Sequence, residues 1–470
     1  MPPPSQARSA QSAAVVCFGA LLLTVSVLGG GGRGGLGDTL VQLLALLLLL
    51  YLCWLSAFNP LPWRAPRWVC WLPVLALILP LIQLLPIPMA WWASAPARAE
   101  LAGQLAQAGV MPIQVISLNP AATEQALWSL LPASALFLST LILPRKAQLT
   151  LLIVIVALAI LSVFMGMAQL ADGNDSPLRL YTPTNRDQAV GFYANRNHFS
   201  GLLAMALPLA FAGTAWAMAE RFTGRRFAPV LAIVGCSLVI LLILGIAMSR
   251  SRAGMLLGMV AVLGSLPLVM SLRQQRGAKR ILAITLGIAV MLSVQFSLLG
   301  ILQRLDADPM SDGRLEYAKV TLEAASSYAP LGSGLGTFQE AYQPFEAKGT
   351  PGRYIINHAH DDYLELWLEG GIPALILMGL GAVAWLWRGR QLLRPGPDIA
   401  EPGGKILFQC RVAWLSASLA LLHSALDFSL RTTASMTVFS VLAAIAFSDR
   451  GGSSRRVAYL EKQSGEMTRA

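Results

Sequence analysis

The chain has 470 residues, of which 55% are apolar and only 13% are charged, and its mean hydropathy is +0.60. This composition excludes an ordinary soluble globular protein and is typical of a protein with many membrane-spanning helices. The net charge of +11 does not indicate nucleic-acid binding, because the basic residues lie in short loops between apolar runs. No two of the five cysteines are spaced as CxxC, so neither a disulfide framework nor a thiolate metal site is predicted.

The apolar runs predict the number of membrane crossings, since a spanning helix needs about 20 mostly apolar residues. The sequence therefore predicts an all-α polytopic membrane protein with about 12 transmembrane helices. The predicted spans are 13–30, 39–58, 68–86, 125–143, 148–170, 198–218, 228–248, 253–272, 281–300, 368–387, 406–428 and 432–448. No small-residue cleavage site follows the first run, so we expect it to be a retained span rather than a signal peptide.

The distribution of loop charges predicts the orientation of the chain. With a cytoplasmic N-terminus, the alternate segments that face the cytoplasm hold most of the 35 Lys and Arg residues, as the positive-inside rule requires. We therefore expect both termini to be cytoplasmic. The chain then divides into a nine-span N-terminal region at 1–300, a large outer loop at 301–367, three C-terminal spans at 368–448 and a cytoplasmic tail at 449–470.

The outer loop at 301–367 is too long for a simple connection, and its mixture of aromatic residues and helical spacing predicts a folded, partly helical segment. A short amphipathic helix is expected after Asp312, which is placed to cap it. The glycine-rich residues 330–338 predict a tight turn or close backbone packing. They do not predict a nucleotide cradle, which requires a preceding strand and a cytoplasmic location. Residues 357–371 are expected to begin the helix that becomes the tenth span.

Arginines in the predicted outer segments are unusual, because the positive-inside rule gives no reason for them. They are Arg186, Arg196, Arg250, Arg252 and Arg314. Guanidinium groups bind phosphate oxygens through paired hydrogen bonds, so a cluster of them at an outer membrane surface suits a lipid diphosphate. Contact with lipid headgroups explains any single arginine equally well. It explains the whole set less well, because three separate outer segments would each have to acquire arginines independently. Ion pairing is a further alternative, with Asp187, Asp306, Asp312 or Glu316 as partners.

Histidines and carboxylates cluster where the outer loop meets the tenth span. His358 and His360 form an HxH pair, but only weakly predict a metal site, because no third histidine is near in sequence. A general base fits better, since a histidine accepts a proton at neutral pH and a neighbouring carboxylate orients its ring. A polar helix cap is the structural alternative. His423, Asp427 and Arg431 are spaced four apart, which places them on one helix face as functional residues or as an ion pair locking the helix end.

Together these segments resemble the bacterial O-antigen ligase and O-antigen polymerase superfamily of polytopic glycosyltransferases. The resemblance covers roughly residues 170–390. Its motifs are Gly191 to His198 before a span, Ser251 to Gly254 opening another, Arg314 with the glycine-rich residues 330–336, and His358 to Glu365 leading into a span with Gly370 to Pro373. The chain departs from the pattern at Asp361, where the family commonly has asparagine, and at Arg196, where it commonly has proline.

The resemblance implies a GT-C-like membrane fold in the bacterial inner membrane, with the active site facing the periplasm. It implies transfer of a glycan from a polyprenyl (undecaprenyl) diphosphate carrier to an acceptor hydroxyl, in lipopolysaccharide or exopolysaccharide synthesis. In that reaction His360 is the candidate base, while Arg252, Arg314 and Arg186 bind the diphosphate and Arg250 and His358 support them. Direct attack inverts the anomeric centre, and neither a metal nor another cofactor is expected.

The acceptor stays open among a lipid A core, a growing glycan and a protein hydroxyl, and the expected environment is membrane lipid without nucleic acid. A polytopic transporter or lipid-linked-oligosaccharide flippase is the main alternative from another class. Transporters place their polar residues near the membrane midplane, often between inverted repeats, whereas this chain concentrates them in outer loops. A purely structural partner in a polysaccharide-export complex does not need the arginine and histidine set.

Overall fold

The computed structural model describes residues 4–32, 36–58, 60–111, 114–182, 186–221, 228–270, 313–346, 355–397 and 401–448, with Gly287 and Met291. Throughout these residues the regular structure is helical, which confirms the predicted all-α polytopic membrane fold. The helices are α1 (Pro4–Gly29), α2 (Leu36–Phe58), η1 (Arg67–Cys70), α3 (Trp71–Gln83), α4 (Met89–Trp92), α5 (Pro96–Gln107), α6 (Pro120–Ile142), α7 (Arg145–Asp172), α8 (Arg196–Arg221), α9 (Ala228–Met248), α10 (Arg252–Met270), α12 (Arg314–Ser327), α13 (Phe338–Tyr342), η3 (Gln343–Phe345), α14 (Asp362–Leu393), α15 (Pro402–Ser424), η4 (Ser429–Arg431) and α16 (Thr433–Phe447).

Within the described residues, seven helices are long and apolar enough to cross a membrane, and four apolar stretches are shorter. The long helices lie in α1, α2, α6, α7, α8, α14 and α15, and the short stretches are Arg67–Gln83, Ile233–Met248, Arg252–Leu268 and Thr433–Phe447. Each overlaps one predicted span. The predicted ninth span, 281–300, lies outside the described residues except for Gly287 and Met291.

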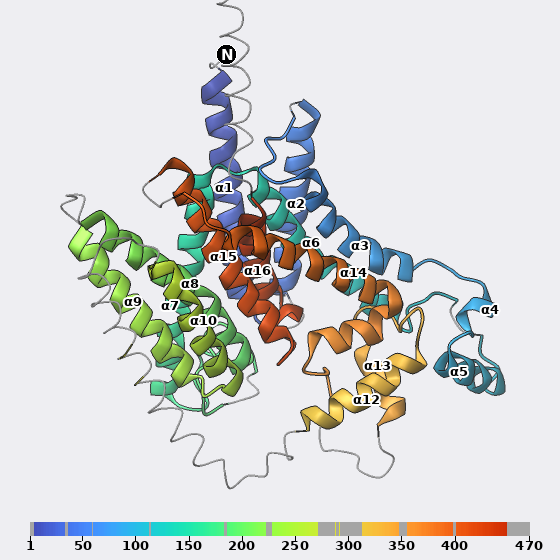
Figure 1. Cartoon of the computed structure of the whole chain (residues 1–470). Coiled ribbons are helices and arrows are strands. Elements are labelled where there is room, and N and C mark those ends of the chain that lie inside the picture. The colour runs from blue at the N-terminus through green and yellow to red at the C-terminus, as the bar shows by residue number, and fades with distance from the viewer. Residues whose placement is uncertain are drawn as a thin grey trace, which may run out of the picture.

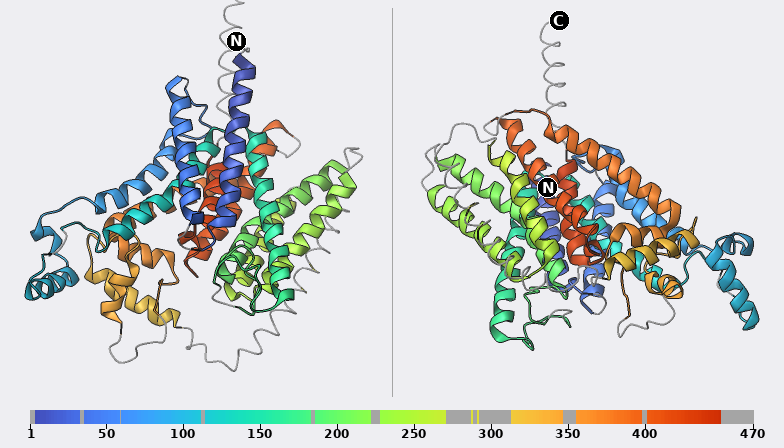
Figure 2. Two further views of the ribbon diagram at one scale, coloured as in Figure 1. Left: turned by 180° about the vertical axis from the view of Figure 1, so that it is seen from behind. Right: turned by 60° about the horizontal axis from the view of Figure 1, so that its bottom comes forward.

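The helices form two groups joined through α15 and α16 (Figure 1). On one side α8 packs against α9 and α10, and on the other α6 packs against α2 and α3. α15 contacts α8, α10 and α16, while α16 contacts α6 and α1, so these two helices connect the groups. The same grouping is visible from behind (Figure 2).

The helices of the outer loop lie at the end of the molecule opposite the N-terminal end of α1 (Figures 1 and 2). α12 and α13 both pack against α14, around a small core that includes Ala324, Phe338 and Leu368. The expected folded, partly helical loop is therefore confirmed for residues 313–346. Asp312 lies outside the described residues, and the residue before α12 is Gly313, which provides no side-chain cap.

The helix of the tenth span begins later than predicted: α14 starts at Asp362 rather than at residue 357. The Asp361 carboxylate accepts hydrogen bonds from the backbone N–H groups of Tyr363 (2.9 Å) and Leu364 (3.1 Å), and so fixes the first turn. His358 and His360 therefore lie before the helix, in a non-helical segment. The prediction that this segment is helical was wrong, since the cap at Asp361 sets the helix start after both histidines.

The glycine-rich loop holds α12 and α13 against α14 through backbone contacts. The N–H of Ile372 donates to the Pro330 carbonyl at 2.9 Å. A Cβ atom at Gly332 would lie 2.5 Å from the Glu369 carbonyl oxygen, and one at Gly371 would collide with the Pro330 oxygen. Gly371 has φ 58° and ψ −150°, a conformation that is essentially restricted to glycine, and it kinks α14. The predicted close backbone packing is thus confirmed.

Replacing Gly371 with alanine is expected to destabilise the protein. The added Cβ meets backbone atoms and forces a residue with a side chain into a glycine conformation, which costs about 1–3 kcal/mol before the clash is counted. We expect a lower thermal unfolding temperature in nanodiscs. Gly379→Ala is the matched control, because Gly379 lies on the same helix with no atom within 4 Å of an added Cβ. Equal unfolding temperatures for the two variants would contradict the importance of this contact.

Candidate active site

His360 and Asp427 form a hydrogen-bonded pair between the outer loop and the segment that follows α15. Nδ1 of His360 lies 2.9 Å from Oδ1 of Asp427. The histidine side chain is 30% exposed, whereas the aspartate is fully buried. His360 has φ 55°, a left-handed conformation that costs a non-glycine residue about 1–3 kcal/mol. Such strain clusters at functional sites, where the surrounding structure holds one side chain in place.

Asp427 is held by groups from further positions in the chain. The Asn197 side-chain amide on α8 donates to Oδ2, and the N–H of Phe428 donates to Oδ1 at 2.9 Å. The Ser251 hydroxyl, just before α10, donates to Oδ1 of Asn197 at 2.7 Å. Burial by itself raises the pKa of Asp427, but the hydrogen bond from His360 and the nearby histidines outweigh it, so the pKa is lowered below its ordinary value. The carboxylate is therefore ionised at neutral pH.

All four histidines of the chain gather around this carboxylate and the neighbouring ring of Phe428. The Phe428 ring stacks on His358 with a centroid separation of 3.9 Å. It meets His198 and His360 edge to face at 4.8 and 5.1 Å. The fourth, His423, is buried at the end of α15. The ring of Phe428 thus contacts three of the histidines and keeps them within one site.

A second ionic network lies along the first turns of α14. Nδ1 of His358 is 2.8 Å from Oε1 of Glu365. Arg431 pairs with three carboxylates of α14, at 3.5 Å to Asp362, 3.4 Å to Glu365 and 2.5 Å to Glu369. Burial alone lowers the pKa of Arg431, but these carboxylates outweigh it and raise the pKa above its ordinary value. The arginine therefore stays charged and ties the loop before α16 to α14.

α12 contributes two side chains from one face. Nη1 of Arg314 donates to the Leu426 carbonyl at 2.9 Å, and Nη2 lies 4.0 Å from Oδ2 of Asp427. Tyr317, one turn further along, stacks on His360 with centroids 6.2 Å apart. The Arg314 side chain is 37% exposed, so part of it stays accessible beside the His360–Asp427 pair. The structure therefore brings Arg314 to the predicted base.

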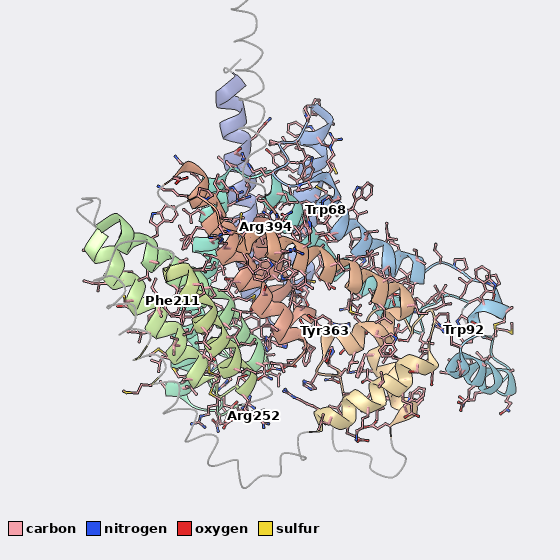
Figure 3. The ribbon with its side chains drawn as sticks, viewed as in Figure 1. Trp68, Trp92, Phe211, Arg252, Tyr363 and Arg394 are labelled. Carbon is pink, nitrogen blue, oxygen red and sulfur yellow. The ribbon has the colours of Figure 1, made fainter. Side chains whose placement is uncertain are left out.

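The other predicted arginines lie near the starts of α8 and α10. Arg186 pairs with Asp175 at 3.2 Å, and Arg250 lies 3.9 Å from Asp187, with both arginines well exposed. Asp187 is one of the carboxylates that the sequence analysis named as a possible ion-pair partner of the arginines. Arg252 is the first residue of α10 and lies at the end of that helix on the same side of the molecule as α12 (Figure 3).

The structure corrects the predicted arrangement of His423, Asp427 and Arg431. These residues do not share one helix face, because α15 ends at Ser424 and the chain turns there. Asp427 contacts His360 instead, while Arg431 contacts α14. The spacing of four residues therefore did not predict a shared helix face, because no single helix contains all three residues.

Of the residues that form the site, Phe428 was not identified from the sequence, and Asn197 was included only as part of the Gly191 to His198 motif. An asparagine and a phenylalanine at span ends are common, so neither gives a signal by its residue type. The positions of the histidines could have indicated the site. The chain has only four, and each lies near the end of a predicted span, which favours one shared site.

The HxH pair does not act as one metal-binding unit, because His358 and His360 contact different carboxylates. In the part of the chain that the structure describes, no group of three or more His, Cys, Asp or Glu side chains is arranged to hold a metal ion. The arrangement instead offers a partly exposed imidazole, a buried carboxylate behind it and a partly exposed guanidinium beside it. Such a set can remove a proton next to a bound anion.

A comparison with known families identifies a related family. Residues 237–379 match the family model described as O-antigen ligase. The match confirms the predicted resemblance to the O-antigen ligase and polymerase superfamily, and it covers Arg252, Arg314 and His360. It supports a glycan-transferring membrane enzyme that uses a lipid-linked glycan and an acceptor. No curated protein matches the chain.

Replacing Arg431 with methionine is expected to destabilise the protein strongly, because it leaves three carboxylates of α14 without their cation. Breaking a buried ion pair from one side costs about 3–5 kcal/mol. Arg390→Met, which removes an exposed charge from the last turn of α14, is the control. Thermal unfolding in nanodiscs measures both variants. Unchanged unfolding of the Arg431 variant would show that these ion pairs do not stabilise the fold.

Proposed function

We propose, on the basis of the O-antigen ligase match, that this chain is a glycosyltransferase of the O-antigen ligase or polysaccharide polymerase type. A glycan moves from a polyprenyl (undecaprenyl) diphosphate carrier to an acceptor hydroxyl. The reaction takes place at the periplasmic face of the bacterial inner membrane, with both chain termini in the cytoplasm. The observation that carries the proposal is that His360 and Arg314, both inside the matched segment, lie against the same buried carboxylate, Asp427.

His360 serves as the base in this mechanism. Because the Asp427 carboxylate accepts the Nδ1–H hydrogen bond, the neutral ring carries its lone pair on Nε2. Nε2 takes the proton as the acceptor hydroxyl attacks the anomeric carbon. Asp427 is a positioning residue that holds the tautomer and stabilises the imidazolium, as the carboxylate does in a Ser-His-Asp triad. Direct attack on the carbon bound to the diphosphate inverts its configuration.

The leaving diphosphate needs positive charge more than it needs a proton. Preorganised guanidinium groups stabilise developing phosphate charge through paired hydrogen bonds. Arg314 stands beside the His360–Asp427 pair with part of its side chain accessible, so it is placed to meet the diphosphate next to the base.

Arg252, the first residue of α10, is proposed as a second ligand of the diphosphate. It follows Ser251, which is linked to Asp427 through Asn197, so the start of α10 is tied to the carboxylate behind the base. Arg186 and Arg250, which are exposed in the segments before α8 and α10, are proposed as further ligands. The mechanism therefore obtains its positive charge from side chains, and none of its steps requires a metal ion.

His358 has a supporting role that differs from that of His360. Its ring is buried, stacks on Phe428 and is bound to Glu365, so it forms part of the wall beside the base. The transporter alternative has less support, since these charged groups gather at helix ends rather than at the middle of the spans.

His360→Ala is expected to lower the rate of glycan transfer about 10²–10⁴-fold, because the general base is removed. Asp427→Asn is expected to cause a loss of about 10⁴-fold at most, since an amide no longer fixes the proton on Nδ1. The rate is measured in nanodiscs, with a purified polyprenyl-diphosphate-linked glycan as donor.

Asp361→Asn is the matched control for both variants. It removes a carboxylate from the same segment, but asparagine caps a helix as well as aspartate does, so the rate should stay within about twofold of the native rate. Native transfer rates for the His360 and Asp427 variants, at normal protein levels, would refute the proposed mechanism.

Arg314→Ala and Arg252→Ala are expected to weaken donor use, with kcat/KM for the donor at least about 100-fold lower, because each removes a charge-assisted contact to the diphosphate. Lys319→Ala removes an exposed charge from α12 and serves as the control. Steady-state kinetics at varied donor concentration measure the effect. Equal values for the arginine variants and the Lys319 variant would remove both arginines from the donor site.

A further inference from the structure

A groove with apolar and basic residues lies at the end of α14 that is farther from the candidate active site. Its described lining consists of Leu386, Gly389, Arg390, Leu393, Arg394 and Trp414. α14 begins at the site and has 32 residues, so it is long enough to cross a hydrocarbon core of about 30 Å. Arg394 accordingly lies nearer the N-terminal end of α1 than Tyr363 does (Figure 3). The groove therefore belongs to the opposite membrane surface and takes no part in the mechanism above.

A close contact between α14 and α15 forms the floor of this groove. A Cβ atom at Gly389 would lie 2.4 Å from the Trp414 ring, so the glycine allows the indole to rest on the backbone of α14. The Trp414 ring also stacks on Trp385 with centroids 6.0 Å apart, and its Nε1–H donates to the Trp385 carbonyl at 3.3 Å. These contacts hold the indole in one position, so the groove is a fixed feature of the helix packing.

An exposed apolar stripe on α14 leads into the groove. Val383 and Leu386 are 67% and 68% exposed, as expected of side chains that contact lipid acyl chains. Positions 383, 386 and 390 follow the three- and four-residue spacing of one helix face, and Arg394 comes one turn later. The stripe therefore runs from the hydrocarbon region directly to Arg390 and Arg394.

These two arginines make the end of the groove favourable to an anion. Both are exposed, and among the described residues neither guanidinium forms a hydrogen bond or an ion pair. The described lining contains no carboxylate. Arg411 donates to the carbonyls of Leu392 and Arg394 at 2.7 and 2.8 Å, which offsets the partial negative charge at the end of the helix.

We propose that this groove binds a phospholipid with an anionic phosphodiester headgroup. The phosphate oxygens accept hydrogen bonds from Arg390 and Arg394, because guanidinium groups bind phosphates through paired hydrogen bonds. One acyl chain lies along Leu386 and Trp414 and continues into the bilayer. A soluble phosphate would use the arginines but leave the apolar wall bare, so the wall favours a lipid. Basic pockets between membrane helices on the cytoplasmic side are typical sites for anionic lipids, which agrees with the proposed orientation of the chain.

Photo-crosslinking tests this site without measuring glycan transfer. The full chain is placed in phosphatidylcholine nanodiscs that contain a low mole fraction of phosphatidylglycerol with a diazirine near the start of one acyl chain. Peptide mass spectrometry measures the cross-link yield at residues 386–394 and 414. A phosphatidylcholine probe with the same diazirine chain gives the yield from bilayer contact alone. The phosphatidylglycerol probe should exceed that yield at least about tenfold, because each arginine near an anionic headgroup favours it about fivefold.

The double variant Arg390→Gln/Arg394→Gln removes both charges and should lower the phosphatidylglycerol yield to that of the phosphatidylcholine probe. Arg67→Gln/Lys146→Gln is the matched control, because it removes two exposed basic residues at the starts of η1 and α7 that do not line the groove. Its yield should stay within about twofold of the wild-type yield. The phosphatidylcholine probe should label both variants as it labels wild-type protein, which shows that they are folded.

Equal yields of the two probes on wild-type protein would overturn the proposal, and so would an unchanged phosphatidylglycerol yield in the double glutamine variant. Glycerol phosphate, which carries the phosphate group without acyl chains, is added as a competitor at constant ionic strength. It should leave the cross-link unchanged. If it suppresses the cross-link, the arginines bind a soluble phosphate and the assignment to a lipid is wrong.

Discussion

The site depends on one electrostatic constraint, which is that carboxylates removed from water must be paired. Three carboxylates on the first turns of α14 face the interior, and Arg431 from the loop before α16 pairs with all of them. An isolated buried charge is costly, so α14 and α16 are held in one relative position by this arginine. Glu365 belongs to the same network and binds His358. The ion pairs that join the helices thereby also fix the wall of the candidate active site.

The second carboxylate system has a different role. Asp427 is fully buried yet ionised, because His360, Asn197 and the Phe428 N–H supply hydrogen bonds. These groups come from the outer loop, α8 and the turn after α15, so the carboxylate joins segments far apart in sequence. His360 in turn adopts a left-handed backbone conformation that is unfavourable on its own. An orientation held against its local preference is expected of a preorganised catalytic side chain.

Two chemically distinct environments flank the catalytic segment. Arg314 and Arg252 lie on α12 and α10, where positive charge suits a diphosphate. A cavity at α2, α6, α14 and α16 is lined mainly by apolar side chains, with Asp38, Asp362 and Arg431 as the charged residues among its described lining.

The sequence by itself determined the fold class, most span positions and the close packing of the glycine-rich loop, and it singled out the candidate base. Apolar run length and loop charge are local properties that the bilayer imposes, so they can be counted along the chain. Only the tertiary structure decided which carboxylate serves which histidine. Asp427 and Arg431 were expected on one face with His423, but the turn after α15 sends Asp427 to His360 and Arg431 to α14. Helix spacing predicts neighbours on one helix and cannot predict contacts across a turn, so the pairing of the buried groups was decided by how the helices pack.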